Sequence, residues 1–111
     1  MTNSKAIFIT GGGSGIGRAI TQYFAGRGWF VGVGDIDTAG MDETLAAIPS
    51  DRCFAHKFDV RDRAAWDTAL NAFAEAAGGR IDVLANNAGI PLGGAIDDNS
   101  TDEIERCLDI N

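Results

Sequence analysis

The sequence has no apolar stretch near the roughly 18 residues that a membrane span needs, and it has few basic residues. Only 9 Lys and Arg residues stand against 16 Asp and Glu residues, which gives a net charge of −7, and the basic residues are not clustered. A surface that follows nucleic-acid phosphates needs clustered Lys and Arg. We therefore expect neither a membrane nor a nucleic acid as partner.

Cysteine and histidine are also scarce. Cys53, Cys107 and His56 form no C-x-x-C pair and no metal-binding spacing, so we predict free buried thiols and no metal site. The N-terminal residues Met1–Lys5 lead into a short apolar run that is unlike a signal peptide. A cytoplasmic location is the resulting expectation.

What the sequence does contain is an alternation of two hydrophobic periods. Its 111 residues, 45% hydrophobic and 23% charged, suit one globular domain over residues 1–111. Four short apolar runs are predicted as strands, the first of them fully buried: Ala6–Ile9, Trp29–Gly34, Cys53–Phe58 and Ile81–Ala85. The helical stripes that follow them are Ile16, Ala19, Ile20, Tyr23 and Phe24; Met41, Leu45 and Ile48; Trp66, Ala69, Leu70, Phe73 and Ala77; and Ile104, Cys107 and Leu108. The order βαβαβαβα predicts an α/β protein with a parallel sheet and right-handed crossovers.

A glycine-rich segment, TGGGSGIG at residues 10–17, joins the first strand to the first helix. The unpaired N–H groups of a helix N-terminus attract anions, and glycine lets a pyrophosphate approach the backbone. The next residues, Arg18 and Ala19, replace the Lys and Ser/Thr of a Walker A loop, which excludes that motif. A pyrophosphate is the ligand that this turn predicts, with a purely structural turn as the alternative. We expect Arg18 to face solvent.

Four segments together resemble the classical short-chain dehydrogenase/reductase family. They are residues 10–17, Asp35 after the second strand, Asp59-Val60 after the third, and Asn86-Asn87-Ala88-Gly89 after the fourth. Each follows the carboxyl end of a strand, where open α/β sheets bind ligands. The resemblance covers the whole chain. It implies a Rossmann-type doubly wound parallel sheet that is incomplete relative to the full family fold.

The resemblance also implies a set of cofactor-binding residues: Gly11, Ser14, Gly15, Ile16, Gly17, Asp35, Asp59, Val60, Asn86, Ala88 and Gly89. Asp35 is the expected partner of the adenine ribose, with Asp37 as its rival. Asp59 and Val60 would lie beside the adenine, although Asp59 could instead cap the following helix. The asparagine pair would hold the sheet, or simply mark a turn.

The family's catalytic groups are a Ser and a Tyr-x-x-x-Lys, and neither pattern occurs in these residues. We expect Tyr23 to lie in the core, and Asn111 matches the family's asparagine that holds a proton-relay water. The resemblance implies a homodimeric or homotetrameric oxidoreductase that transfers a hydride between a nicotinamide cofactor, NAD rather than NADP, and an alcohol or carbonyl substrate. This chain would be its cofactor-binding half, inactive alone. The alternative is a non-catalytic dinucleotide-binding module or sensor.

Overall fold

The computed structural model describes residues 4–89 and residue 102 of the chain. The predicted fourth helix and Asn111 lie outside the described residues. In chain order, the elements are β1 (Ala6–Thr10), α1 (Gly15–Ala25), β2 (Phe30–Asp35), α2 (Thr38–Leu45), a 3-10 turn (Ser50–Arg52), β3 (Cys53–Lys57), α3 (Arg63–Ala76) and β4 (Val83–Ala85). The alternation of strands and helices is therefore confirmed as far as β4.

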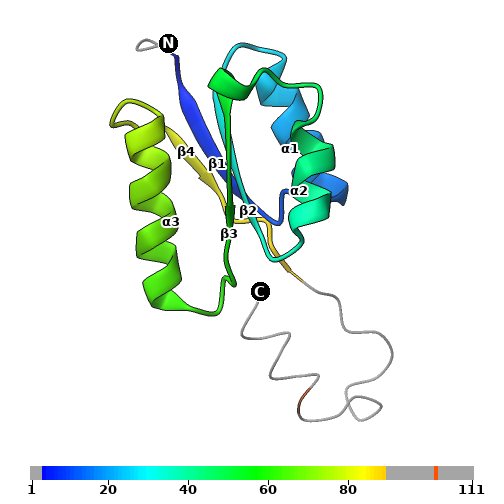
Figure 1. Cartoon of the computed structure of the whole chain (residues 1–111), viewed down its shortest axis with the longest axis vertical. Helices are drawn as coiled ribbons and strands as arrows, with labels where there is room; N and C mark the ends of the chain where they lie inside the picture. The colour runs from blue at the N-terminus through cyan, green and yellow to red at the C-terminus, as the bar shows by residue number, and fades with distance from the viewer. Residues whose placement is uncertain (1–3, 90–101, 103–111) are drawn as a thin grey trace.

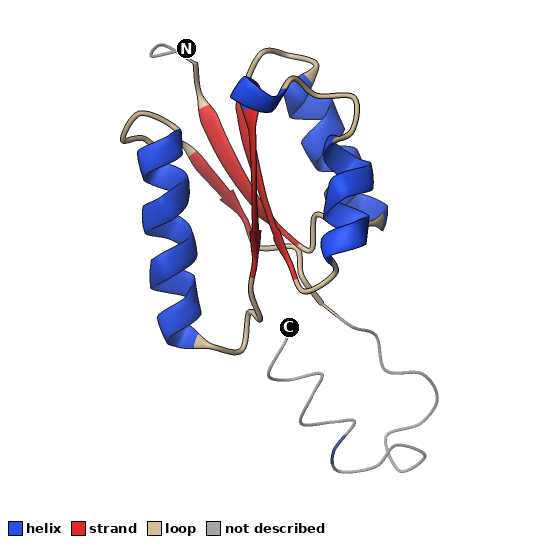
Figure 2. Cartoon of the chain, in the orientation of Figure 1, coloured by secondary structure: helices blue, strands red, loops and turns tan. Residues whose placement is uncertain are grey.

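The strands form one parallel sheet in the order β3-β2-β1-β4. Helices α1 and α2 cover one face of this sheet and α3 covers the other (Figures 1 and 2). The chain moves outward from β1 through β2 to β3, and then returns to place β4 on the other side of β1. In open α/β sheets, ligands bind at the carboxyl edge where the strand order reverses. Here that edge lies beyond Thr10 and Ala85.

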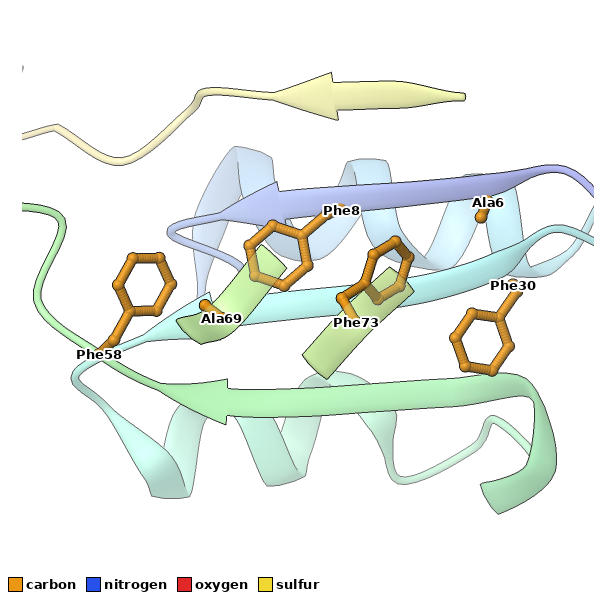
Figure 3. Close-up of a cluster of buried hydrophobic side chains, with 6 residues drawn as sticks. All are labelled: Ala6, Phe8, Phe30, Phe58, Ala69 and Phe73. Atoms are coloured by element: carbon orange, nitrogen blue, oxygen red, sulfur yellow. The ribbon is translucent and has the colours of Figure 1, made fainter. Parts of the chain in front are cut away.

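Aromatic side chains fill the space between the sheet and α3 (Figure 3). The Phe73 ring on α3 is fully buried, and its centroid lies 5.2 Å from that of Phe8 and 5.6 Å from that of Phe30. Phe58, just past β3, extends this cluster toward the carboxyl edge of the sheet, where its ring meets Trp66. The aromatic cluster therefore joins the core to the edge at which a ligand is expected.

The apolar stripe of α1 is rotated by one residue from its predicted position. Tyr23 was expected in the core, but it is 53% exposed and stacks beneath the Arg27 guanidinium. The buried positions are Gly17 and Thr21, whose small side chains let α1 approach the sheet closely. Glycine and threonine do not count as hydrophobic positions, so the hydrophobic pattern placed the buried face of α1 on larger residues such as Ile16 and Tyr23.

Strand boundaries differ from those predicted by one or two residues: β1 ends at Thr10, β2 spans Phe30–Asp35, β3 ends at Lys57 and β4 begins at Val83. β2 continues through Asp35 because that residue still pairs with Lys57 of β3, and its carbonyl accepts a hydrogen bond from Phe58 N. β4 begins only at Val83, and Asp82 before it accepts a hydrogen bond from Ala6 N at 2.7 Å. The Arg80 guanidinium and the Ala6 amide hold the pKa of Asp82 below its ordinary value.

The predicted buried thiol is only partly enclosed. Cys53 is half-buried at the start of β3, where burial, assisted by Asp51, raises the pKa of its thiol. Cys107 lies outside the described residues. Among the helices described, none has both the length and the apolar character to cross a membrane.

Replacing Phe73 with Ala tests the aromatic cluster. We expect the free energy of unfolding to fall by about 3–5 kcal/mol, because the substitution leaves a cavity among packed rings. The matched control is Tyr23→Ala on the exposed face of α1, which should cost less than about 1 kcal/mol. Urea denaturation followed by circular dichroism measures both. Equal losses for the two variants would contradict the arrangement of α1 and α3.

Candidate functional site

The turn between β1 and α1 is packed so closely that side chains are excluded from it. Gly11 has a positive φ of 69°, and a Cβ atom there would lie 3.0 Å from Ala88 Cα. A Cβ atom at Gly17 would overlap the Gly11 carbonyl oxygen. Glycine is therefore favoured at Gly11 by its backbone conformation and required at Gly17 by space. The backbone of the loop is left bare at the carboxyl edge of the sheet.

One buried hydroxyl group connects this turn to the segment after β4. Thr10 Oγ1 accepts hydrogen bonds from Asn87 N at 3.0 Å and from Ala88 N at 3.1 Å. Its own proton can go to Ala85 O at 3.5 Å or to Asn86 Oδ1 at 3.4 Å. The Asn87 side chain donates in return to the Thr10 carbonyl at 3.2 Å. These bonds fix the two segments on either side of the point where the strand order reverses.

Asp35, at the end of β2, faces the glycine loop. Its Oδ2 accepts a hydrogen bond from Gly13 N at 2.9 Å, and its Oδ1 accepts one from Asp37 N at 3.1 Å. A carboxylate has about four acceptor positions, so two backbone donors leave two of them for a ligand. Its rival, Asp37, is the N-cap of α2 and accepts from Gly40 N at 2.9 Å. The geometry therefore favours Asp35 over Asp37 as a ligand-binding residue.

A cavity of about 130 Å³ opens at this edge of the sheet. Its lining is mostly apolar, with the two carboxylates of Asp35 and Asp59. The residues around it are Gly11, Gly34, Asp35, Ile36, Phe58, Asp59, Val60, Ala88 and Gly89. Six of these were predicted from the sequence, whereas Gly34, Ile36 and Phe58 were not. The cavity brings together segments that follow β1, β2, β3 and β4.

Asp59 does not cap the following helix, so that alternative is wrong. The cap of α3 is Asp62, whose Oδ1 accepts a hydrogen bond from Ala65 N at 3.2 Å. Asp59 instead pairs with Arg61, whose Nη2 lies 2.7 Å from Asp59 Oδ2. Val60 stands beside it, and its carbonyl is fixed by Trp66 Nε1 at 2.7 Å. Asp59 and Val60 thus form part of a well-connected cavity wall.

The remaining predicted residues do not line this cavity. Ser14 takes the N-cap position of α1 in an extended conformation without a side-chain capping bond. Gly15 and Ile16, which follow it, are exposed at the start of the helix. The first N–H groups of a helix have no partner within it, so this terminus offers donors to an anion. Asn86 is exposed just past β4.

Arg18 does not face solvent as the sequence predicted. Its Nη2 donates to Gly13 O at 2.7 Å and to Gly40 O at 3.2 Å, and its Nε donates to Thr44 Oγ1 at 3.0 Å. Carbonyl groups freed by the glycine turn attract the guanidinium back toward the protein. Sequence reasoning missed both Arg18 and Thr44. The available signal was a threonine in the second turn of α2 that faces the sheet.

Comparisons with known proteins agree with this geometry. The family model described as "short chain dehydrogenase" matches residues 5–111. The chain is 35% identical to meso-2,3-butanediol dehydrogenase of Serratia marcescens over 98% of its length, and 41% identical to galactitol 2-dehydrogenase of Agrobacterium fabrum over 98%. These matches cover 43% and 42% of the two relatives. The chain therefore spans less than half the length of the curated relatives it matches.

Solved structures give the same result. A short chain dehydrogenase from Bacillus anthracis superimposes with a TM-score of 0.90 at 26% identity, over 99% of this chain and 46% of that one. The actinorhodin polyketide ketoreductase F189W variant, solved with NADPH, superimposes with a TM-score of 0.88 at 28% identity, over 99% of this chain and 42% of that one. The Rossmann-type sheet predicted from the sequence is confirmed, and the chain contains part of it.

Replacing Thr10 with Val tests the link between the glycine turn and the segment after β4. Valine keeps the shape but leaves the Asn87 and Ala88 amides without their acceptor, so we expect the free energy of unfolding to fall by about 1–3 kcal/mol. Both amides should also exchange faster with solvent, as followed by NMR. Thr10→Ser is the control and should restore most of the loss. Unchanged exchange in Thr10→Val would show that the hydroxyl does not hold this segment.

Proposed function

The chain belongs to the short-chain dehydrogenase family, and from that premise we propose that it binds NAD for an oxidoreductase reaction on an alcohol or carbonyl compound. When bound, the nicotinamide ring supplies or accepts the hydride. The residues described here would hold the adenosine half and the pyrophosphate. The observation that carries the proposal is the Asp35 carboxylate, which stands on the cavity with two acceptor positions left over.

Asp35 suits a pair of neighbouring hydroxyl groups. Both of its oxygens already accept one backbone N–H each, so the carboxylate is fixed in orientation before a ligand arrives. One further acceptor position on each oxygen matches the 2′ and 3′ hydroxyls of an adenine ribose. Such charge-assisted hydrogen bonds are among the stronger ones that a protein can offer.

The segments around Asp35 suit the other parts of the same ligand. Phe58 and Val60 provide apolar surface on which a flat adenine ring can lie, and Asp59, whose carboxylate is bonded to Arg61, lies beside them. The bare glycine backbone and the free N–H groups at the start of α1 suit a pyrophosphate. We propose these roles for Gly11, Ser14, Gly15, Ile16 and Gly17 as a group.

The charges around the cavity favour NAD over NADP. Among the described residues, its lining carries two carboxylates and no Lys or Arg side chain. Three basic residues lie on neighbouring segments. Arg18 is bonded to loop and helix carbonyls and to Glu43, and Arg61 is paired with Asp59. Lys57, opposite Asp35 on β3, does not line the cavity. Two unit charges about 4 Å apart repel by about 4 kcal/mol at an effective dielectric constant of 20. A 2′-phosphate beside Asp35 would meet repulsion of this kind.

The similar proteins support a small-molecule substrate that carries a hydroxyl or carbonyl group. Two relatives are named for such compounds, a butanediol and a sugar alcohol. We propose the same broad class for this chain and no individual compound. The homo-oligomer and the cytoplasmic location stay predictions, as does the role of Asn111.

Cofactor titration tests the assignment of Asp35. We expect the chain to bind NAD about 10- to 100-fold more tightly than NADP, a difference of about 1–3 kcal/mol. Asp35→Ala should weaken NAD binding and reduce this preference, because both the hydrogen bonds and the repulsion are lost. Asp42→Ala, which removes the same charge from an exposed position on α2, is the control. Preference for NADP, or an unchanged ratio in Asp35→Ala, would show that Asp35 is only a turn residue.

Binding without turnover is the second expectation for the 111-residue chain. The Ser and Tyr-x-x-x-Lys that the resemblance assigns to proton transfer are not among its residues, and loss of such assistance costs about 10²–10⁴ in rate. NADH absorbance with a panel of alcohols and ketones measures turnover, and the intrinsic fluorescence of the chain measures binding. Turnover at ordinary enzyme rates would contradict this division of roles.

A further inference from the structure

Thr44 is a fully buried threonine on α2 whose hydroxyl bonds outside its own helix. A buried hydroxyl needs a partner, and on a helix the carbonyl four residues earlier usually provides one. Thr21 on α1 follows this rule, because its Oγ1 donates to Gly17 O at 2.7 Å. Thr44 Oγ1 lies 3.1 Å from the corresponding Gly40 O, but only 2.6 Å from Gly12 O in the glycine loop. Its shortest hydrogen bond therefore joins α2 to the loop.

Arg18 contacts the same hydroxyl group. Its Nε donates to Thr44 Oγ1 at 3.0 Å, so the threonine oxygen is the acceptor there and must send its single proton elsewhere. The same guanidinium holds Gly13 O at 2.7 Å through Nη2. Thr44 and Arg18 therefore donate hydrogen bonds to two successive carbonyl groups of the loop, those of Gly12 and Gly13.

The peptide unit between Gly12 and Gly13 connects these hydrogen bonds to Asp35. A peptide unit is planar and trans, so its C=O and N–H groups point in opposite directions and turn together. Thr44 holds the oxygen of this unit, and its N–H, on Gly13, donates to Asp35 Oδ2 at 2.9 Å. Because the Gly12 carbonyl is held in place, the Gly13 N–H is held too. That N–H in turn fixes the position of Asp35 Oδ2.

We propose that Thr44 and Arg18 are positioning residues for ribose recognition, acting on Asp35 through the Gly12–Gly13 peptide. This inference rests on the proposed function, since it takes the ribose hydroxyls as the ligand of Asp35. Neither residue touches the ligand in this account. Without the threonine hydroxyl the peptide is free to rotate, the Gly13 N–H leaves Asp35 Oδ2, and the carboxylate loses its orientation toward the two hydroxyls.

A comparison of two ligands and several variants tests the proposal. The ligands are NAD and its analogue that lacks the 2′ hydroxyl on the adenine ribose, and the measured quantity is the ratio of their dissociation constants by calorimetry. We expect wild type to favour NAD and Thr44→Val to reduce that preference by about 5- to 20-fold, the worth of about one hydrogen bond. Thr44→Ser should restore it. Thr21→Val, the same change at an equally buried threonine, should leave the ratio unchanged.

The possible outcomes separate the two levels of the proposal. Wild type with no preference for NAD over the analogue would refute the ribose contact of Asp35, and the positioning role with it. Wild type with a preference that Thr44→Val retains would refute the positioning role alone. Arg18→Met, at a partly exposed position, provides a second variant if Thr44→Val does not fold, and it should reduce the ratio in the same direction. A retained ratio in Arg18→Met would equally refute the positioning role.

Discussion

The hydroxyl group of Thr10 is the interaction on which the candidate site depends most. It lies fully buried at the end of the central strand and accepts the Asn87 and Ala88 amides from the far side of the strand-order reversal. Open α/β sheets have a crevice where the strand order reverses, which here lies between β1 and β4. The hydroxyl keeps the two edges of the crevice at a fixed separation. The Gly11 backbone can then approach Ala88 without closing the cavity.

The aromatic core and the candidate site are continuous with each other. Phe58 belongs to the buried cluster beneath α3 and also lines the cavity. A Cβ atom at Gly34 would overlap the Phe58 ring, so the glycine at the end of β2 makes room for it. The ring that would support an adenine is thus held by the same packing that stabilises the fold. Asp35, the next residue along the strand, faces the opposite side and meets the glycine loop.

The site residues that could be predicted from the sequence are those in local motifs or at the ends of strands. The glycine turn and Asp35 were identified from their spacing and their place at strand ends, whereas the Asp59-Val60 pair was identified from the family resemblance. Arg18 and Thr44 were missed because they meet through space, and the separation of 26 residues between them carries no local pattern. The exposure of Tyr23 was missed for another reason. Glycine and threonine form the buried face of α1, and neither contributes to hydrophobic periodicity.

The central claim is that the cavity at the end of β1 and β2 binds the adenosine half of NAD. An NMR titration of the ¹⁵N-labelled chain with NAD tests it residue by residue. The account predicts that the amide signals of Gly13, Asp35, Val60 and Ala88 move together and saturate with one dissociation constant. Signals of Gln22 and Gly26, which line a separate groove between α1 and α2, should stay in place. No change around the cavity at millimolar NAD, or a change confined to the groove between α1 and α2, would contradict the account.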